Sequence, residues 1–413
     1  MSDLSAIAAI STPLGTGGVG IIRISGKNAT KIADRVFVSV NGKKLSASKG
    51  YRAYFGKIYD GESAVDEVVC LVFRAPHSYT GEDTVEINCH GGIVLMKKIL
   101  RLVLQNGAQA ATPGEFTKRA FLNGKLDLSE AESVMTLISA QGEQGTSAAF
   151  NQLEGTLSRK IDKINSSLLS LAAHIAAWVD YPDDEIEELG ENELCNTINN
   201  ANLELSALLN NFDSGMAITN GVEAAIVGKP NVGKSTLMNL LTGYDRSIVT
   251  EIEGTTRDVV EETINLNGCI LRISDTAGMR ETGDIVEKLG VERSKKKLER
   301  ASIVFAVFDL SKPLSGEDRE LIDECKGKNV IPIINKTDLE PCLDVEYIKN
   351  TLDTPLFISA KNGDGYNELC ERVANLMGTK NFDTTSAMLV NERQRLCRQE
   401  HPSGPGAKRP LTL

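Results

Sequence analysis

Apolar residues follow three different patterns along the chain. From 217 to 378, continuous apolar runs of strand length at 222–227, 269–275, 302–309, 329–334 and 355–359 alternate with stretches of helical spacing. Strands that alternate with helices in this way predict a doubly wound, mostly parallel α/β sheet.

Between 121 and 215 the period changes to that of helices. Apolar positions such as Leu168, Leu171, Ile175 and Trp178 recur every three or four residues, which predicts an all-α region. An acidic stretch at 180–188 interrupts the pattern, and we expect it to be a solvated turn followed by the start of a helix.

The first 120 residues combine both periods. Apolar runs at 6–10, 19–24, 68–73 and 84–88 predict strands, and 94–105 has helical spacing. We expect His90-Gly-Gly92 to form a tight turn and Cys89 to be a buried apolar side chain. This part of the chain is therefore predicted to be an α+β domain.

Composition is that of a soluble multidomain protein. The chain has 413 residues, 24% charged and 41% apolar, so two or three globular domains are expected. No apolar run is long enough to span a membrane, and no signal-peptide pattern begins the chain. The eight cysteines form no Cys-x-x-Cys pair, which favours reduced thiols. We therefore expect a cytoplasmic protein.

Charge is distributed unevenly along the chain. Residues 1–120 contain 15 Lys or Arg and 10 Asp or Glu, a net charge of +5. Because the whole chain has a net charge of −11, the remaining residues carry −16. An acidic chain is poorly suited to coating RNA, so any contact with nucleic acid is expected to be local or to belong to a partner.

The most informative motif is Gly-Lys-Pro-Asn-Val-Gly-Lys-Ser at 228–235, which follows an apolar run and precedes a helical one. Glycines allow backbone N–H groups to surround phosphate oxygens. Lys234 can bind the β- and γ-phosphates, and the hydroxyl of Ser235 suits Mg²⁺. The motif predicts a phosphate-binding loop for a nucleoside triphosphate.

Three further motifs follow predicted strands in the same region. Asp275-Thr-Ala-Gly278 can hold Mg²⁺ through water and contact the γ-phosphate. In Asn335-Lys-Thr-Asp338, the carboxylate of Asp338 can accept hydrogen bonds from guanine N1–H and N2–H₂, which adenine cannot donate. Lys336 would lie over the base, and Ser359-Ala-Lys361 would place an N–H near guanine O6. Together the motifs resemble a translation-factor-class GTPase domain.

Two further parts of a GTPase site have to be assigned: the second protein ligand of Mg²⁺ and the group that stabilises charge during hydrolysis. Thr256, within Thr250–Asp258, is our choice for the second protein ligand of Mg²⁺. Met279 stands where a glutamine would orient the attacking water, and neither Arg257 nor Arg280 is clearly an arginine finger. Charge stabilisation must therefore come from another source.

Several strings resemble one family along nearly the whole chain. They are Gly254-Thr-Thr-Arg-Asp258, residues 12–26, Tyr79-Thr-Gly-Glu-Asp83, His90-Gly-Gly92 and residues 113–128, and they are similar to the MnmE (TrmE) tRNA modification GTPases. The resemblance implies a homodimer formed by a domain over 1–120 that binds 5-formyltetrahydrofolate. It also implies a helical domain split into 121–216 and 379–413 by a GTPase domain inserted at 217–378.

The resemblance also implies an activity. With an FAD-dependent partner (MnmG or GidA), in a heterotetramer, the family adds a carboxymethylaminomethyl or aminomethyl group to C5 of the wobble uridine, U34, of certain tRNAs. K⁺ takes the place of an arginine finger, and the matching ligands here are Asn231, Thr250, Ile252 and Thr255. Glu287 matches the family's glutamate that orients the attacking water. Glu287 and Lys234 are therefore the two catalytic residues expected here.

Other site residues are assigned in the same way. Arg23, Glu82 and Lys125 match the folate-binding positions of the family. The GTP-binding residues expected here are Asn231, Val232, Gly233, Lys234, Ser235, Thr236, Thr250, Glu251, Ile252, Glu253, Gly254, Thr255, Thr256, Asp275, Thr276, Ala277, Gly278, Asn335, Lys336, Asp338, Ser359, Ala360 and Lys361.

The last residues depart from the family pattern, which ends in Cys-x-Gly-Lys. From 396 to 413 the chain contains prolines and glycines that cannot continue a helix, and it resembles a truncated or frame-shifted end. Two alternatives therefore stay open. One is a remnant that binds GTP and folate without modifying tRNA, and the other is a GTP-gated switch in ribosome assembly.

Overall fold

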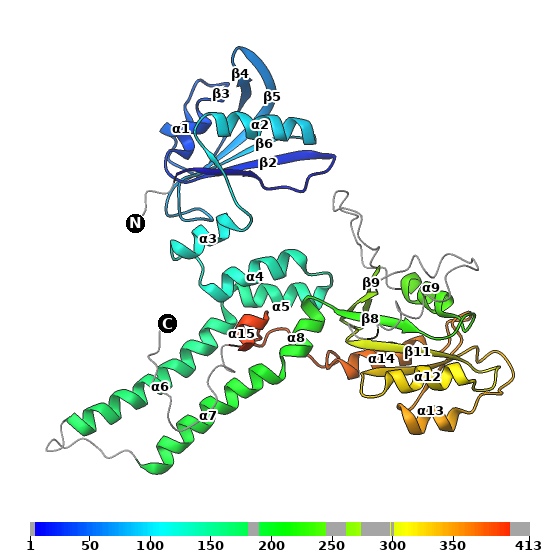
Figure 1. Cartoon of the computed structure of the whole chain (residues 1–413). Helices are drawn as coiled ribbons and strands as arrows, with labels where there is room; N and C mark the ends of the chain where they lie inside the picture. Colours follow the sequence, from blue (N-terminus) through cyan, green and yellow to red (C-terminus); the bar gives the residue numbers. More distant parts are fainter. Residues whose placement is uncertain (1–4, 181–189, 245–261, 274–297, 299–300, 397–413) are drawn as a thin grey trace. The chain divides into compact units, whose positions relative to one another are not determined.

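The computed structural model describes residues 5–180, 190–244, 262–273, 298 and 301–396 (Figure 1). The chain separates into two compact units, the first of which runs to Ala131 and the second of which holds most of the residues from Glu132 onward. We call them the N-terminal unit and the second unit. The division into three domains at 120, 216 and 378 stays a prediction.

A seven-stranded sheet forms the N-terminal unit, in the order β3-β4-β5-β6-β2-β1-β7. Its strands are β1 (Ile7–Ile10), β2 (Gly17–Ser25), β3 (Phe37–Ser39), β4 (Arg52–Asp60), β5 (Ser63–Phe73), β6 (Thr84–Gly91) and β7 (Gln109–Ala110). Neighbouring strands are antiparallel except β1 and β7. The expected α+β architecture is confirmed.

One face of this sheet is covered by α1 (Ala29–Ala33), the 3₁₀ turn η1 (Leu45–Ala47) and α2 (Ile93–Gln105). Their apolar side chains join those of the strands in a single core cluster. A further helix, α3 (Glu115–Leu122), follows β7.

The structure corrects one local prediction in this unit. His90 and Gly91 are the last residues of β6, and α2 begins two residues later, so His90–Gly92 is not a tight turn. Pairing with β2 extends the strand, because Gly91 lies opposite Gly17. Cys89 is buried as expected, its thiol donates to the carbonyl of Gly20, and burial raises its pKa to about 11.

Helices form the first part of the second unit. They are α4 (Leu128–Ser139), which crosses the boundary between the units, α5 (Glu143–Leu153), α6 (Thr156–Asp180), α7 (Glu191–Asn210) and α8 (Phe212–Thr219). Most of the acidic stretch at 180–188 lies outside the described residues. A short helix, α15 (Glu392–Leu396), lies near the end of the described chain.

The segment before α15 packs against these early helices. The side chain of Asn151 donates to the carbonyl of Thr384 at 2.9 Å, and that of Gln152 to the carbonyl of Ser386 at 3.1 Å. Met388 is fully buried in a cluster with Ala148. Residues more than 230 positions apart in the sequence therefore share one helical core.

The α/β part of the second unit is a six-stranded sheet in the order β13-β12-β11-β8-β10-β9. Its strands are β8 (Val222–Val227), β9 (Glu262–Leu266), β10 (Cys269–Ile273), β11 (Ile303–Asp309), β12 (Val330–Asn335) and β13 (Leu356–Ile358). All neighbours are parallel except β9 and β10.

Helices cover both faces of this sheet. α9 (Lys234–Tyr244) and α14 (Tyr366–Leu376) contribute to one core cluster, and α12 (Gly316–Cys325) and α13 (Val345–Thr351) contribute to another. Alternate side chains of β11 enter the two clusters, since Phe305 lies in one and Phe308 in the other. The doubly wound fold predicted from the apolar runs is therefore confirmed. No helix within the described ranges is long and apolar enough to cross a membrane.

Candidate functional site

The phosphate-binding loop joins the end of β8 to the start of α9, as predicted. Its backbone turns tightly, with φ of 64° at Asn231 and 99° at Gly233. A Cβ atom on Gly233 would lie 2.1 Å from Nδ2 of Asn335, which donates to the carbonyl of Val232 at 2.9 Å. Only glycine fits this close approach between two loops.

Lys234 lies folded over the loop that precedes it. Its Nζ donates to the carbonyl of Gly228 at 2.7 Å and to that of Lys229 at 2.6 Å. Burial lowers the pKa of this ammonium group. The cation is thus held at the loop, where phosphate oxygens would compete with the two carbonyls for its protons.

The residues predicted to select guanine are brought together by Asn335. This side chain is 3% exposed, and its Oδ1 accepts from the N–H of Ala360 at 3.0 Å. Asp338 is exposed, and one of its carboxylate oxygens accepts from the hydroxyl of Ser359 at 3.0 Å. A cavity of about 420 Å³ lies beside these loops, lined by Thr236, Asn239, Leu240, Gly243, Ala360 and Lys361.

Lys336 links the guanine-selecting loop to the phosphate-binding loop. Its Nζ donates to the carbonyl of Asn231 at 2.9 Å and pairs with Oδ2 of Asp309 at 2.6 Å. Asp309 is 4% exposed. Burial favours a higher pKa for this carboxyl, but hydrogen bonds from Lys336 and Ser311 outweigh it and hold the pKa below its usual value.

Sequence reasoning assigned no role to Asp309 or to Lys229. Nζ of Lys229, in the phosphate-binding loop, lies 2.6 Å from Oδ2 of Asp318 and 2.8 Å from Oγ of Ser315. These two residues form the capping box at the start of α12. The loop is therefore anchored from both sides, by Lys229 to α12 and by Lys336 to β11.

Some predicted GTP-site residues lie outside the described part of the chain. They are Thr250, Glu251, Ile252, Glu253, Gly254, Thr255, Thr256, Asp275, Thr276, Ala277, Gly278 and Glu287. Of the predicted potassium ligands only Asn231 is described, and of the predicted magnesium ligands only Ser235.

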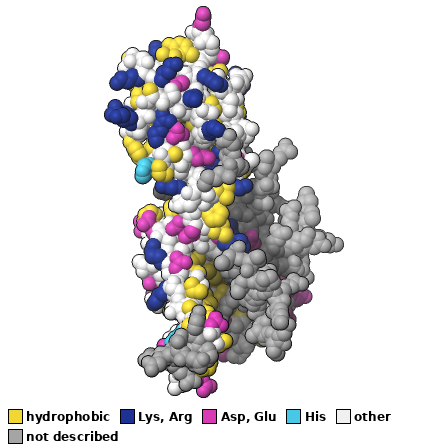
Figure 2. All heavy atoms as spheres, turned by 90° about the vertical axis from the view of Figure 1, so that its left-hand side faces the viewer, with side chains coloured by type: hydrophobic (Ala, Val, Ile, Leu, Met, Phe, Trp, Pro, Cys, Tyr) yellow, Lys and Arg dark blue, Asp and Glu magenta, His cyan; other side chains and the backbone are white. Residues whose placement is uncertain are grey.

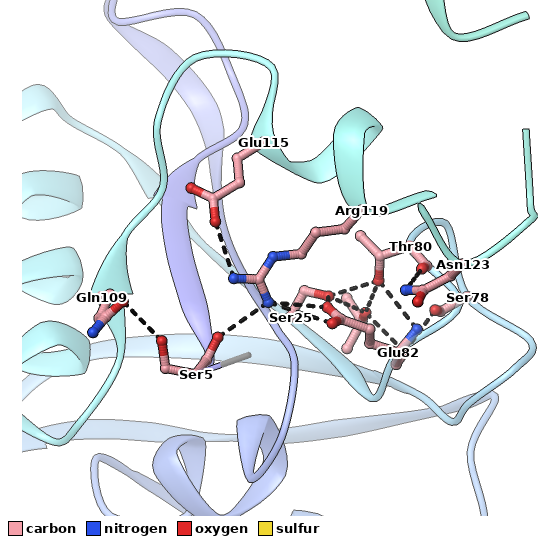
Figure 3. Close-up of polar contacts among 10 residues, drawn as sticks. Ser5, Ser25, Ser78, Thr80, Glu82, Gln109, Glu115, Arg119 and Asn123 are labelled. Carbon is pink, nitrogen blue, oxygen red and sulfur yellow. Dashed lines mark hydrogen bonds and ion pairs between the residues drawn. The ribbon is translucent and has the colours of Figure 1, made fainter. Parts of the chain in front are cut away.

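A second polar site lies in the N-terminal unit, around the loop at 78–83 (Figure 3). Glu82 accepts a hydrogen bond from the hydroxyl of Ser25 at 2.9 Å, and Ser25 contacts Thr80 at 2.6 Å. NH1 of Arg119 lies 3.3 Å from the same carboxylate oxygen of Glu82. Glu82 is thus fixed between β2 and α3.

Arg119 is the residue here that sequence reasoning missed. It is 3% exposed, and it also donates to the carbonyl of Ser5 and to Glu115, both at 3.0 Å. Its Nε has no hydrogen-bond partner among the described residues. An arginine on a short amphipathic helix gives no sequence signal of burial, because Ser5 and Glu82, which enclose it, lie far away in the sequence.

The other two predicted folate residues lie beside the same loop. Arg23 pairs with Glu86 at 2.8 Å, and its guanidinium carbon lies over the rings of Tyr79 and Phe116, at 5.5 and 5.6 Å from their centroids. The stem of Lys125 packs against Gly81, where an added Cβ would lie 3.2 Å from Cγ of the lysine. The fold therefore brings Arg23, Glu82 and Lys125 into one region.

Comparison with known proteins identifies the family. A model described as the GTP-binding protein TrmE N-terminus matches residues 6–125, and one described as the MnmE helical domain matches 128–400. The chain is 42% identical over 394 residues to the tRNA modification GTPase MnmE of Clostridioides difficile, covering 94% of this chain and 85% of that protein. The chain belongs to the MnmE family of tRNA modification GTPases.

A second MnmE agrees with this assignment. The MnmE of Bacillus subtilis is 42% identical over 398 residues, which is 95% of this chain and 87% of that protein. Among solved structures, Era of Aquifex aeolicus is 30% identical and covers 42% of this chain and 62% of its own, with a TM-score of 0.30.

Membership of the MnmE family makes the chain a GTPase that acts in tRNA modification. Two described side chains carry charge that suits this activity. Lys234 brings positive charge to the phosphate-binding loop, and the exposed carboxylate of Asp338 can accept hydrogen bonds.

Proposed function

We propose that this MnmE-family GTPase adds a carboxymethylaminomethyl or aminomethyl group to C5 of the wobble uridine, U34, of certain tRNAs. It acts with the FAD-dependent partner MnmG in a heterotetramer, and uses a one-carbon unit from 5-formyltetrahydrofolate. The observation that supports this most directly is the convergence of Arg23, Glu82 and Lys125 around one loop.

The chemistry of this loop suits a folate. The carboxylate of Glu82, held by Ser25 and Arg119, can accept hydrogen bonds from the N–H groups of a pterin ring. Arg23 and Lys125 can pair with the carboxylates of the glutamate tail. The ring of Tyr79 is partly exposed and offers an apolar surface to a planar ligand.

We further propose that K⁺ stimulates GTP hydrolysis and that Mg²⁺ is held by Ser235 and Thr256. Ser235 is exposed in the first turn of α9, where its hydroxyl oxygen suits a hard cation. Asn231, with Thr250, Ile252 and Thr255, would hold the potassium ion, which supplies positive charge near the phosphates. Glu287 would orient the attacking water. Two copies of the chain would associate through their N-terminal domains in the cytoplasm.

Hydrolysis rates in different salts test the nucleotide half of the proposal. We expect GTP to be hydrolysed much faster in KCl than in NaCl at equal ionic strength. Replacing Asn231 by Ala should remove most of this difference while GTP binding persists, because the phosphate contacts of Lys234 remain. Equal rates in the two salts would contradict the potassium assignment.

Ligand binding tests the folate half. A Glu82→Gln variant should bind 5-formyltetrahydrofolate more weakly by roughly 1.5–3 kcal/mol, the range for hydrogen bonds to charged groups. The matched control is Glu67→Gln, which removes an exposed carboxylate on β5 and should leave binding unchanged. Calorimetric titration measures both. Equal affinity in the two variants would rule out the role given to Glu82.

A further inference from the structure

Positive charge is concentrated in the N-terminal unit of an otherwise acidic chain. The first 120 residues carry a net charge of +5, although the whole chain carries −11. On the face seen in Figure 2, lysine and arginine side chains gather over the N-terminal unit. Most of these cations belong neither to the GTP site nor to the predicted folate site.

Six exposed cations define what we call the basic face. Two lie on or just after α1, two in the loop before η1, and two on the outer side of α2; they are Lys31, Arg35, Lys43, Lys44, Lys97 and Arg101. Because α1, η1 and α2 cover the same face of the sheet, their outer sides point away from it together.

Direct contacts join the three elements into one surface. The carboxylate of Asp34 accepts from the N–H of Leu45 at 2.6 Å and of Ser46 at 3.0 Å, which fixes η1 against the end of α1. NH1 of Arg35 donates to the carbonyl of Asn106 at 2.8 Å, which fixes the same end of α1 to the end of α2.

The charges of the basic face are not neutralised by carboxylates. None of its six members forms an ion pair within the part of the chain that the structure describes. Other lysines do, such as Lys98 with Asp60 at 3.3 Å and Lys57 with Glu67 at 3.1 Å. The carboxylate of Asp34, which contacts η1, is occupied by two backbone N–H groups. Like charges held together in this way create a positive potential that favours a polyanion.

We propose that the basic face binds the phosphate backbone of tRNA. Cations spread over three elements suit a ligand with repeated negative charges better than a single small anion. This inference rests on the proposed function, since it supplies the contact with the substrate that the acidic remainder of the chain is poorly suited to make. Such contacts position the RNA without reading its sequence.

Salt-dependent binding tests the proposal. Two variants of the full chain, Lys43→Gln with Lys44→Gln and Lys97→Gln with Arg101→Gln, are titrated with fluorescently labelled bulk tRNA at several KCl concentrations. Each should bind about tenfold or more weakly near 0.1 M salt. Each should also make the negative slope of log K against log salt shallower by about 1.4–1.8, because each lost phosphate contact removes roughly 0.7–0.9 from its magnitude.

The matched control removes the same charge from paired lysines. Lys57→Gln with Lys160→Gln should retain the parental affinity and slope, since both lysines already pair with glutamates. GTP hydrolysis without tRNA should be the same in all variants, which shows that the fold is intact.

Two outcomes would overturn the assignment of this surface. One is that both basic-face variants bind tRNA with the parental affinity and salt slope. The other is that the parental chain binds vesicles rich in phosphatidylserine but not tRNA. Nucleoside analysis of tRNA from a deletion strain separates this inference from the proposed function. If the parental chain restores the modified U34 and the variants bind tRNA normally, only the basic face is refuted; if the parental chain restores nothing, the proposed function fails.

Discussion

The ammonium group of Lys336 bridges the carboxylate of Asp309 and the backbone carbonyl of Asn231. Two loops separated by about a hundred residues are thus joined by one side chain. Asp309 ends an apolar strand, which is the same signal that drew attention to Asp275. The sequence could place this carboxylate at the edge of the sheet, but its partner depends on how Lys336 folds back, at a φ of 67°.

Gly233 carries the first prediction. A Gly233→Ala change would force a Cβ to within 2.1 Å of Nδ2 of Asn335 and a side chain onto a φ of 99°. We expect it to destabilise the fold by roughly 1–3 kcal/mol and to weaken GTP binding, because the phosphate-binding loop must shift. Urea unfolding and titration with a fluorescent GTP analogue measure the two effects.

Gly316, the first residue of α12, offers the control. Its added Cβ would meet no atom within 4 Å, so Gly316→Ala should be neutral or stabilise by about 0.5–1 kcal/mol. A loss of GTP affinity as large as that of Gly233→Ala would show that the close approach to Asn335 is not the cause.

At the scale of elements, the strands buried on both faces were the easiest to predict. The run that became β11 is apolar at every position before Asp309, because it fills two core clusters at once. The segment that forms β4 gives no comparable apolar run, because only alternate residues face the core and one of these is Gly56. A Cβ there would lie 2.2 Å from the carbonyl of Val38, so the position needs glycine although the apolar pattern loses a member.

The residues of the candidate sites also fall into those that the sequence can predict and those that it cannot. Motifs that lie within one loop, such as residues 228–235, could be placed from the sequence alone. Lys229, Asp309 and Arg119 could not, because their partners are brought close only by the fold.

The second prediction concerns the start of α12. The hydroxyl of Ser315 accepts from the N–H of Asp318, whose carboxylate accepts in return from the N–H of Ser315. Ser315→Ala should reduce the free energy of unfolding by about 1 kcal/mol, as for other lost N-caps. The phosphate-binding loop should keep its anchor, because Lys229 still pairs with Asp318.

Denaturant unfolding measures the loss, and Ser167→Ala serves as the control. The hydroxyl of Ser167 donates to a carbonyl within α6 and caps nothing, so its removal should change stability by less than about 0.5 kcal/mol. Equal losses in the two variants would contradict a specific role for the cap.

At the scale of the whole molecule, the chain returns to helices that it left before the α/β sheet. Arg393 pairs with Glu132 at 2.6 Å, and the N–H of Met388 donates to the side chain of Gln152 at 3.4 Å. The helical core therefore forms only when the segments that precede and follow the α/β sheet in the sequence meet. Contacts of such long sequence separation are expected to form late in folding.

Met388 gives the third prediction. Met388→Ala removes a fully buried side chain and should cost about 2–5 kcal/mol in unfolding of the helical core. GTP affinity should be retained, because Met388 packs with Ala148 and Val390 rather than with the nucleotide loops.

Thermal unfolding with and without GTP measures this effect. The control is Met135→Ala, a residue on α4 that is 66% exposed and should change stability little. If Met388→Ala abolished GTP binding at temperatures where the protein remains folded, the helical core and the α/β part of the second unit would be more tightly coupled than their separate core clusters suggest.

The uneven charge of the chain has a consequence for encounters at a distance. A positive N-terminal unit and a negative remainder give the molecule an electric dipole, so an approaching polyanion would be turned toward one unit before any atom touches. Since charges more than about 10 Å apart are largely screened at 0.1 M salt, this orienting effect would act in the last stage of approach and fade as ionic strength rises. It would thus set how quickly and in which direction the partner arrives, separately from how tightly it is finally held.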